Sequence, residues 1–463
     1  MGVVIPTELG TEKISSLLKK YALPAIIAMA ASSLYNIVDS IFIGQGCGPL
    51  AIAGLAITFP LMNLSAAFGT LVGVGALTTI SVFLGQRNYE AAQRSFGNAF
   101  VMNAIVGIIY MALVFSLLDP ILLFFGASEN TLPYARDYML VILLGNIITH
   151  EYFGLNAIMR ASGMPKEAMY ATLFTVFNNA ILDALFILVF GWGITGAAAA
   201  TVLSQFLSLC WIMYLFSNKQ RIIHFRRGIY KLKFRFIKDM ISVGMAPFLM
   251  NSAACAVVII INKQLYYYNG DLAIGAYGIV NRVLFLFVMV VLGLNQGMQP
   301  IAGYNFGAGK YTRVKRVFKL TVICATIVSC VGFIVSEFMP DLAVSLFTND
   351  PELKELADKG LRLTNLAFPL VGFQMVATNF FQSLGMVHKS ILLSLSRQLL
   401  FLVPLIYFLP VFFGHHGVWM SFPIADTAAI VLSTILLLSL FRKFRKLNDG
   451  DDPAILGSKI KQA

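Results

Sequence analysis

Charged residues are scarce in this 463-residue chain, in which Asp, Glu, Lys and Arg together make up only 12%. A soluble domain usually carries about twice that share of charge. Hydrophobic residues account for 58% of the chain, and its mean hydropathy is +0.79. A chain of this composition cannot cover itself with a polar surface. A soluble enzyme, a disordered protein and a disulfide-stabilised scaffold are therefore excluded.

Several sequence signatures of enzymes and pumps are also missing. The chain has no P-loop, which argues against ATP-driven pumping, and no HExxH motif. Its five cysteines show no CxxC pairing, and we interpret them as small hydrophobic residues. We therefore expect a protein that is not an enzyme and that needs no cofactor.

The net charge of +12 does not indicate nucleic-acid binding, because the basic residues lie mostly between apolar runs. Twelve runs have the roughly 20 mostly apolar residues that a membrane-spanning helix needs. The runs lack the short alternating period of a membrane β-barrel. They cover 19–44, 52–83, 96–118, 133–160, 168–190, 194–216, 237–268, 273–304, 317–338, 355–384, 390–412 and 417–441.

Lysine and arginine are absent from the segments that directly follow the odd-numbered runs, such as QGCGPLA after the first and MPDLAVSLFTNDP after the ninth. The other loops are basic, and the stretch from Lys219 to Lys238 alone holds eight Lys and Arg residues. Positive loops stay on the cytoplasmic side of a membrane. The pattern predicts a multi-pass membrane protein with both termini in the cytoplasm.

An internal repeat divides the chain. A shift of 222 residues aligns 48–164 with 270–386 without a gap, matching for example Tyr89 with Tyr311 and Arg94 with Arg316. The repeat unit is six helices, so both halves start on the same side of the membrane. We expect an N-terminal lobe (1–217), a basic cytoplasmic linker (218–235), a C-terminal lobe (236–445) and a cytoplasmic tail (446–463). Two pseudo-symmetric lobes with a site between them are typical of secondary transporters.

Ionisable residues inside a bilayer are costly and are candidates for function. The first half holds two carboxylates, Asp39 four residues after Tyr35 and Asp183 four residues after Asn179, so each pair shares one helix face. Thr201 likewise follows Ala197 by four residues. Oxygen atoms of these types suit a hard cation or a proton. Two carboxylates in a dry site repel each other unless Na+ or H+ lies between them, although a purely structural hydrogen-bond network is the alternative.

The second half lacks this pattern, because the 222-residue shift places Ile261 opposite Asp39. Its polar residues either line a substrate cavity or pair with their neighbours. The candidate cavity residues of both halves are Tyr35, Asn36, Asn156, Asn262, Lys263 and Arg282. Glu151, Glu337, Arg397 and Asp426 are weaker candidates of the same kind.

Six sequence segments resemble the multidrug and toxic compound extrusion (MATE) family of transporters, and the resemblance covers about residues 14–445. They are YNIVDSIFIG at 35–44, LGQRNYEAAQR at 84–94, RASGMPKEA at 160–168, NNAILD at 178–183, GITGAAAAT at 193–201 and QGMQPIAGYNFGAGKY at 296–311. The last one is closest to the bacterial branch. The resemblance implies an all-α membrane fold of twelve helices, in two six-helix bundles that form a V around a central cavity.

The resemblance also implies a function, the exchange of Na+ or H+ for organic, often cationic, drugs. It implies a cation site, and the family's positions carry over to Asp39, Asn179, Asp183, Thr201 and Ala197, with Tyr35 and Asn156 adjoining. With Na+ as the ion, Asp39, Asn179, Asp183 and Thr201 would be its ligands. Some family members have further acidic residues on helices 7 and 10. Here the seventh run has none, which argues against a second cation site.

Two other functions compete with drug export. A lipid-linked oligosaccharide flippase of a related fold would have a larger, more basic cavity and often extra helices. An intramembrane enzyme would need a metal or nucleophile motif, and the sequence shows none. We expect the partners to be small organic cations or drugs and the lipid bilayer, with no nucleic acid, and we expect a monomer.

Overall fold

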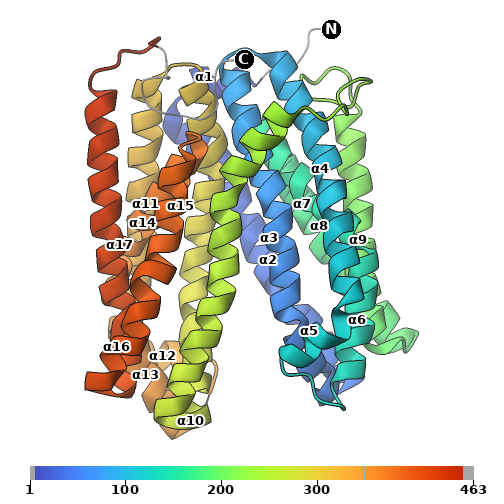
Figure 1. Ribbon diagram of the computed structural model, residues 1–463, viewed down its shortest axis with the longest axis vertical. Helices are drawn as coiled ribbons and strands as arrows, with labels where there is room; N and C mark the ends of the chain where they lie inside the picture. Colours follow the sequence, from blue (N-terminus) through green and yellow to red (C-terminus); the bar gives the residue numbers. More distant parts are fainter. Residues whose placement is uncertain (1–5, 349, 452–463) are drawn as a thin grey trace. The chain divides into compact units, whose positions relative to one another are not determined.

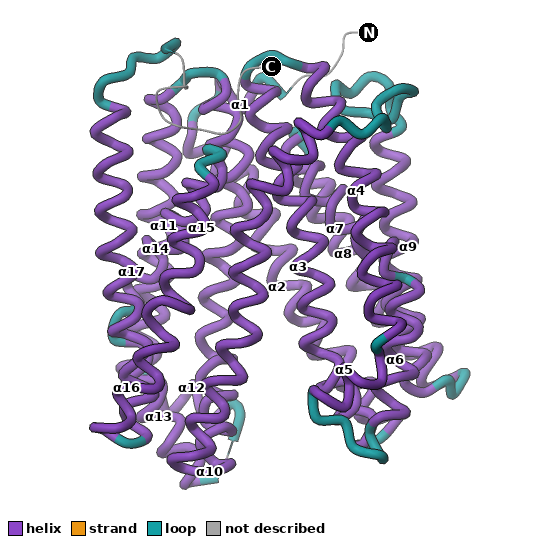
Figure 2. The backbone as a smooth tube through the Cα atoms, in the orientation of Figure 1, coloured by secondary structure: helices purple, strands orange, loops and turns teal. Residues whose placement is uncertain are grey.

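The protein is described by a computed structural model that covers residues 6–348 and 350–451, except for the side chains at 36, 37, 269 and 271. Within these ranges every regular element is helical and no strand occurs (Figure 2). The expected all-α class is confirmed. A helix satisfies its backbone hydrogen bonds internally, which the bilayer interior requires because it offers no water.

The helices reproduce most of the expected spans. Ten helical segments are long and apolar enough to cross a membrane, and one bent pair brings the number to eleven in the described residues. The segments are α2 (Ile14–Cys47), α3 (Pro49–Gly85), α4 (Tyr89–Ser116), α8 with η1 (Pro165–Val189), α9 (Gly193–Phe216), the two parts of α10 (Phe234–Tyr268 and Leu272–Gly307), α11 (Tyr311–Phe338), α15 to α16 (Val387–Phe413) and α17 (His415–Phe444); the bent pair is α6 (Leu132–Leu144) with α7 (Asn146–Ala161).

The tenth expected run, 355–384, differs from the prediction of one continuous apolar span. It is divided between α13 (Pro351–Asn365) and α14 (Phe368–Ser383). The first of these is amphipathic and polar, with charged side chains at Glu352, Lys354, Glu355, Asp358, Lys359 and Arg362. This charge keeps α13 from meeting the composition of a membrane span.

The chain divides into two compact units. In the described residues, unit 1 comprises 6–11 and 27–248, and unit 2 comprises 12–26 and 249–451. This division departs from the expected lobes at 1–217 and 236–445, because the first turns of α2 belong to unit 2 and the first turns of α10 belong to unit 1. Close backbone contacts explain both assignments: Gly297 lies against Ala22 in unit 2, and Gly244 lies against Leu71 in unit 1.

The 222-residue repeat is visible in the element boundaries. Helix α4 covers Tyr89–Ser116 and α11 covers Tyr311–Phe338, so both ends are 222 residues apart. The starts of α9 at Gly193 and α17 at His415 keep the same spacing, although they lie outside the aligned segment. The short helices α5 (Leu118–Phe124) and α12 (Pro340–Ser345) also correspond. The two units therefore share one order of helices.

In unit 1 the basic linker after α9 is held against the start of α4. Arg226 forms an ion pair with Glu90, and the Lys233 backbone N–H donates to Asn98 Oδ1 at 2.8 Å. The Asn98 amide in turn donates to the Lys231 carbonyl at 3.2 Å. Figure 1 shows this linker at the end of unit 1 opposite α5, whose loop has neither Lys nor Arg. The basic and non-basic loops of this unit thus lie at opposite ends.

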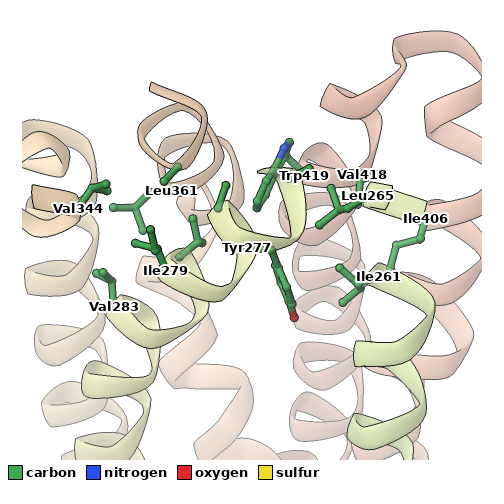
Figure 3. Packing of buried hydrophobic residues seen from close by; sticks show 14 of the residues in the cluster. Ile261, Leu265, Tyr277, Ile279, Val283, Val344, Leu361, Ile406, Val418 and Trp419 are labelled. Atoms are coloured by element: carbon green, nitrogen blue, oxygen red, sulfur yellow. The ribbon is translucent and has the colours of Figure 1, made fainter. Parts of the chain in front are cut away.

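In unit 2 the segment after α17 is held against the start of α11, as the linker is held against the start of α4 in unit 1. The Tyr311 hydroxyl donates to the Asp451 carbonyl at 2.7 Å, and the Thr312 N–H donates to Asp449 Oδ1 at 2.9 Å. This end of unit 2 lies opposite α12 and α13 (Figure 1). The hydrophobic core near that opposite end contains Ile261, Leu265 and the neighbouring rings of Tyr277 and Trp419, whose centroids are 6.2 Å apart (Figure 3).

The close approach of α10 to α3 gives a test of unit 1. A Cβ atom at Gly244 would lie 1.7 Å from the Leu71 carbonyl oxygen, so the backbones must move apart to accept it. We expect Gly244→Ala to lower the free energy of unfolding by about 1–3 kcal/mol, the usual cost of overpacking. Thermal unfolding of the purified protein in detergent measures the change.

Gly278→Ala in the same helix is the matched control, because no atom lies within 4 Å of its built Cβ. This variant should unfold at the wild-type temperature or slightly above it, since alanine favours helix. Equal behaviour of the two variants would contradict the described approach of α10 to α3.

Candidate functional site

Three helices of unit 1 carry the residues that the sequence predicts for cation binding. Helix α2 carries Tyr35 and Asp39, α8 (Pro165–Asp183) carries Asn179 and Asp183, and α9 carries Ala197 and Thr201. Helices α8 and α9 are adjacent along the chain and pack against each other. Because each pair of residues is spaced by four, both members point to the same side of their helix.

The two carboxyl groups are buried together. Asp39 is 6% exposed and Asp183 is fully buried, and their side chains lie within hydrogen-bonding reach of each other. One oxygen of each carboxyl, Oδ1, is sealed from solvent and has no hydrogen-bond donor. Two carboxylates so placed cannot both be ionised without a positive charge between them. The pair therefore has the chemistry to hold a proton or a small cation.

Neutral oxygen and nitrogen atoms complete the site. The hydroxyls of Tyr35 and Thr201 are 3.0 Å apart, which links α2 to α9. Asn179 is fully buried. The orientation of its amide that gives both atoms a hydrogen-bond partner has Nδ2 donating to Asp183 Oδ2 at 2.7 Å and Oδ1 accepting from the Thr201 N–H at 3.3 Å. Ala197, one turn before Thr201, is also fully buried. The structure thus brings all of these predicted cation-site residues together.

Two features of the site were missed by the sequence reasoning. Tyr138 of α6 is buried and lies close enough to Asp39, Tyr35 and Asp183 to interact with them electrostatically. A tyrosine in an apolar run has no spacing signal that distinguishes it from other core aromatics. The second feature is the π-helical turn η1 (Ala184–Val189), which begins directly after Asp183. Such turns often occur at functional sites.

Asn156 takes part in a different set of contacts. Its Nδ2 donates to the Ala168 carbonyl at 2.9 Å, and its Oδ1 accepts from Arg160 Nη1 at 2.7 Å. These bonds join α7 to α8 and hold Arg160, and none of them reaches Asp39 or Asp183. The side chain of Asn36 lies outside the described residues. The role of both residues in a substrate cavity stays a prediction.

The candidates from the second half belong to unit 2. Asn262 is half-buried on α10, whereas Lys263 and Arg282 on the same helix are exposed and form no ion pair among the described residues. Arg397, in the π-helical turn η2 (Ser396–Leu402), donates through Nε to Asp426 Oδ1 at 2.5 Å. Arg397 and Asp426 therefore neutralise each other. A cavity-lining role for Asn262, Lys263 and Arg282 stays a prediction.

The ligand set limits which ion the site in unit 1 can hold. The described residues contain no group of three or more His, Cys, Asp and Glu side chains arranged for a metal. Two carboxyls with amide and hydroxyl oxygens are hard ligands of low total charge. They match a proton or a monovalent cation such as Na+, and they differ from the nitrogen and sulfur ligands that bind zinc.

Known protein sequences match this chain over most of its length. The MatE family model matches residues 24–185 and 245–408. The multidrug export protein MepA of Staphylococcus haemolyticus is 28% identical over 420 residues, which are 91% of this chain and 92% of that protein. MepA of Staphylococcus aureus strain MSSA476 is 26% identical over 422 residues, 91% of this chain and 93% of that protein.

Comparison with solved structures confirms the fold. A multidrug resistance MATE family transporter of the MOP superfamily, in an outward-facing conformation, matches with a TM-score of 0.90 at 22% identity, over 96% of this chain and 100% of that chain. A MOP superfamily transporter from Pyrococcus furiosus matches with the same score, identity and coverage. At this identity the likeness concerns the arrangement of helices alone.

The contact between α2 and α9 can be tested by a double-mutant cycle. Removing either hydroxyl of the Tyr35–Thr201 pair leaves the other buried without its partner. We expect Tyr35→Phe and Thr201→Val to show a coupling energy of about 0.5–1.5 kcal/mol in the free energy of unfolding. Denaturant unfolding of the four proteins in detergent micelles gives this energy.

Thr195→Val provides the control cycle, because Thr195 is a half-buried residue of α9 whose hydroxyl donates to the Trp192 carbonyl at 2.6 Å. Its effect should simply add to that of Tyr35→Phe. Additive behaviour in the Tyr35–Thr201 cycle as well would refute the contact.

Proposed function

The chain belongs to the MATE family, and from this premise we propose that it is an antiporter that exports organic, often cationic, drugs in exchange for Na+ or H+. The names of the relatives support drug export, since both MepA proteins are called multidrug export proteins. They favour this function over the lipid-linked oligosaccharide flippase, the alternative that the sequence left open. The coupling ion is the part of the proposal that rests on the site in unit 1.

The observation that carries the coupling is the burial of two facing carboxyl groups. Asp39 and Asp183 lie on different helices, α2 and α8, and both are buried. Repulsion between two buried carboxylates favours uptake of a positive charge, and release of that charge leaves the repulsion uncompensated. Occupancy of the site by an ion therefore changes the force between α2 and α8. A change of this kind is what couples ion binding to helix movement in an exchanger.

The neutral residues determine how the charge is held. Asn179 donates through Nδ2 to Asp183 Oδ2 and accepts through Oδ1 from the Thr201 N–H, and Tyr35 bonds to the Thr201 hydroxyl from α2. In the sodium form of the proposal, Asp39, Asn179, Asp183 and Thr201 supply the oxygens around Na+, with the Ala197 carbonyl nearby. In the proton form, one proton lies on the carboxyl pair. Both forms use the same atoms, so the ion has to be identified by transport.

We also propose that the protein lies in the bacterial inner membrane with both termini in the cytoplasm. The distribution of Lys and Arg supports this orientation, because the linker, with seven Lys and Arg residues, lies at one end of unit 1 and the loop of α5 at the other (Figure 1). Positively charged loops are retained on the cytoplasmic side. The candidate substrate residues Tyr35, Asn36, Asn156, Asn262, Lys263 and Arg282 remain part of the proposal.

Neutral replacement of either carboxyl tests the coupling. We expect Asp39→Asn and Asp183→Asn each to reduce export of a fluorescent organic cation from proteoliposomes at least ten-fold. The amide keeps the shape of the carboxyl but cannot bind and release a positive charge. Export is measured with an inward Na+ gradient and an inward H+ gradient imposed separately, and the gradient that drives the wild type identifies the ion.

Asp137→Asn is the matched control for loss of one carboxylate. Asp137 lies on the exposed side of α6, so this variant should export at the wild-type rate. Wild-type export by Asp39→Asn under either gradient would contradict the proposed role of the carboxyl pair.

Cysteine labelling tests the orientation. In a variant without the five native cysteines, a cysteine at Ser128 should react with an impermeant thiol reagent added to intact cells, and one at Tyr230 should not. Both positions are exposed and lie in loops of unit 1 at opposite ends. Tyr230 becomes reactive only when the membrane is opened, if the proposed orientation holds. Labelling of the Tyr230 position in intact cells would reverse the orientation.

A further inference from the structure

A second group of buried polar side chains lies in unit 1, where α3, α4 and α7 pack together. We call it the α3–α4–α7 cluster, and its members share an exposure of 6% or less. They are Ser65 of α3, Asn103 of α4, and Asn146, His150 and Glu151 of α7. None of them belongs to the Asp39–Asp183 site. The cluster combines an acid and a base in the interior of a membrane helix bundle, where ionisable residues are functional candidates.

The hydrogen bonds around His150 determine its tautomer. The Ser65 hydroxyl donates its single hydrogen to Asn146 Oδ1 at 2.6 Å. Asn146 is oriented by its Nδ2, which donates to the Gly107 carbonyl at 3.1 Å. The contact of 3.1 Å between Ser65 Oγ and His150 Nε2 therefore requires Nε2–H to be the donor. The other ring nitrogen, Nδ1, then carries a lone pair, and it is buried without a hydrogen-bond partner.

Glu151 follows His150 along α7, and it forms no ion pair among the described residues. Both of its carboxyl oxygens are sealed from solvent and form no hydrogen bond of normal geometry, although the Asn103 amide and the Ala104 backbone N–H lie near enough to interact with them. A carboxylate in such a place would lose its hydration in exchange for these weak contacts alone. The described arrangement therefore fits a neutral Glu151 that retains its proton.

The acid and the base face the same stripe of α4. Glu151 lies beside Asn103, and His150 Nδ1 lies 3.6 Å from the position that a Cβ would take at Gly107, one turn further along α4. Gly154 of α7 allows the close approach, since a Cβ there would lie 2.0 Å from Asn103 Nδ2. The two unsatisfied groups are thus enclosed between the same pair of helices.

No other charge competes for this place among the described residues of the neighbouring helices. Helices α3 and α9 contain no charged side chain. The phenol of Tyr110 faces His150 with ring centroids 6.3 Å apart, but its hydroxyl donates to the Leu61 carbonyl at 2.6 Å. The charged residues of the other helices packed on α7 lie elsewhere. On α4, Glu90 pairs with Arg94; on α6, Arg136 pairs with Asp119, and Asp137 is exposed. On α8, Lys166 and Glu167 are in the first turn, and Asp183 belongs to the carboxyl pair.

The cluster follows a break in the span. Helices α6 and α7 meet at Gly145 with a bend of 57°, and His150 and Glu151 lie in the second turn after the bend. A change of this bend would move both side chains along α4. The proton on Glu151 and the lone pair on His150 would then change their environment together.

We propose that Glu151 and His150 form a second proton-binding site, separate from the Asp39–Asp183 pair. The ligand is a proton, because one carboxyl and an imidazole nitrogen do not make the oxygen cage that Na+ requires. When the proton leaves the Glu151 oxygen and binds His150 Nδ1, the carboxylate and the imidazolium balance each other in charge. This inference rests on the proposed function in one respect: uptake and release of the proton at this site would accompany transport.

Infrared difference spectroscopy of the full-length protein tests the site without a transport assay. The background is the Asp39→Asn/Asp183→Asn double variant, from which the carboxyl pair is absent. We expect its spectra, recorded through a pH titration, to contain the C=O stretching band of a protonated carboxylic acid. Adding Glu151→Gln should remove that band. A band of unchanged intensity after Glu151→Gln would overturn the proposal.

Two further variants in the same background complete the test. Glu337→Gln is the control, because Glu337 is paired with Arg362 at 3.6 Å in unit 2, and this variant should leave the Glu151 band in place. His150→Gln keeps a donor for Ser65 but has no titratable nitrogen, and it should shift the pH midpoint of the Glu151 band by at least one pH unit. An unshifted midpoint would remove His150 from the site and so refute the pair.

The experiment separates this inference from the proposed function. Failure of Asp39→Asn to stop export would contradict the coupling role of the carboxyl pair and would leave the infrared result unaffected. Failure of the Glu151 band to appear would contradict the second proton site and would leave export by the carboxyl pair standing. His150→Gln still reports on the site if Glu151→Gln does not elute as a folded protein.

Discussion

The inability of a bilayer interior to solvate polar groups is the constraint on which this structure depends. Every backbone N–H and C=O in the apolar spans must be satisfied within the protein, and the described residues meet this demand with helices alone. The same constraint accounts for the scarcity of charge. Several ionisable side chains that do enter the spans pair with other polar groups, as Asp39 does with Asp183 and Arg397 does with Asp426.

Close helix packing follows from the same constraint, since lipid tails give helices no hydrophobic reason to associate. Glycines on α3 and α10 let backbones approach until a single Cβ would collide with a carbonyl, as at Gly75 and Gly244 in unit 1. The corresponding approach in unit 2 involves Gly297 and Ala22. Helix α10 makes these contacts through its first turns in unit 1 and through its last turns in unit 2, and α2 contributes its first turns to unit 2 and the rest to unit 1. Each of these two helices therefore contributes residues to both units.

A symmetric scaffold here carries asymmetric chemistry. The helices of the two units begin and end at equivalent positions of the 222-residue repeat, so the fold repeats almost element by element. The ionisable groups do not repeat. Unit 1 holds the carboxyl pair and the α3–α4–α7 cluster, whereas the corresponding region of unit 2 holds a neutralised pair, Arg397 with Asp426.

The sequence by itself determined the helical class, the approximate spans and the residues of the carboxyl site, because apolar length and four-residue spacing depend only on local order along the chain. It could also single out Glu151 as a costly acid, but it could not show that His150 is a free base or that Asn103 lies beside the carboxyl. Those facts depend on α3, α4 and α7 meeting across long stretches of chain. Tyr138 and the π-helical turn after Asp183 were missed for the same reason, whereas the tenth run is divided by the charges of α13, a local feature of the sequence. Apolar periodicity identifies which residues are buried, whereas tertiary packing alone decides which buried polar atoms find a partner.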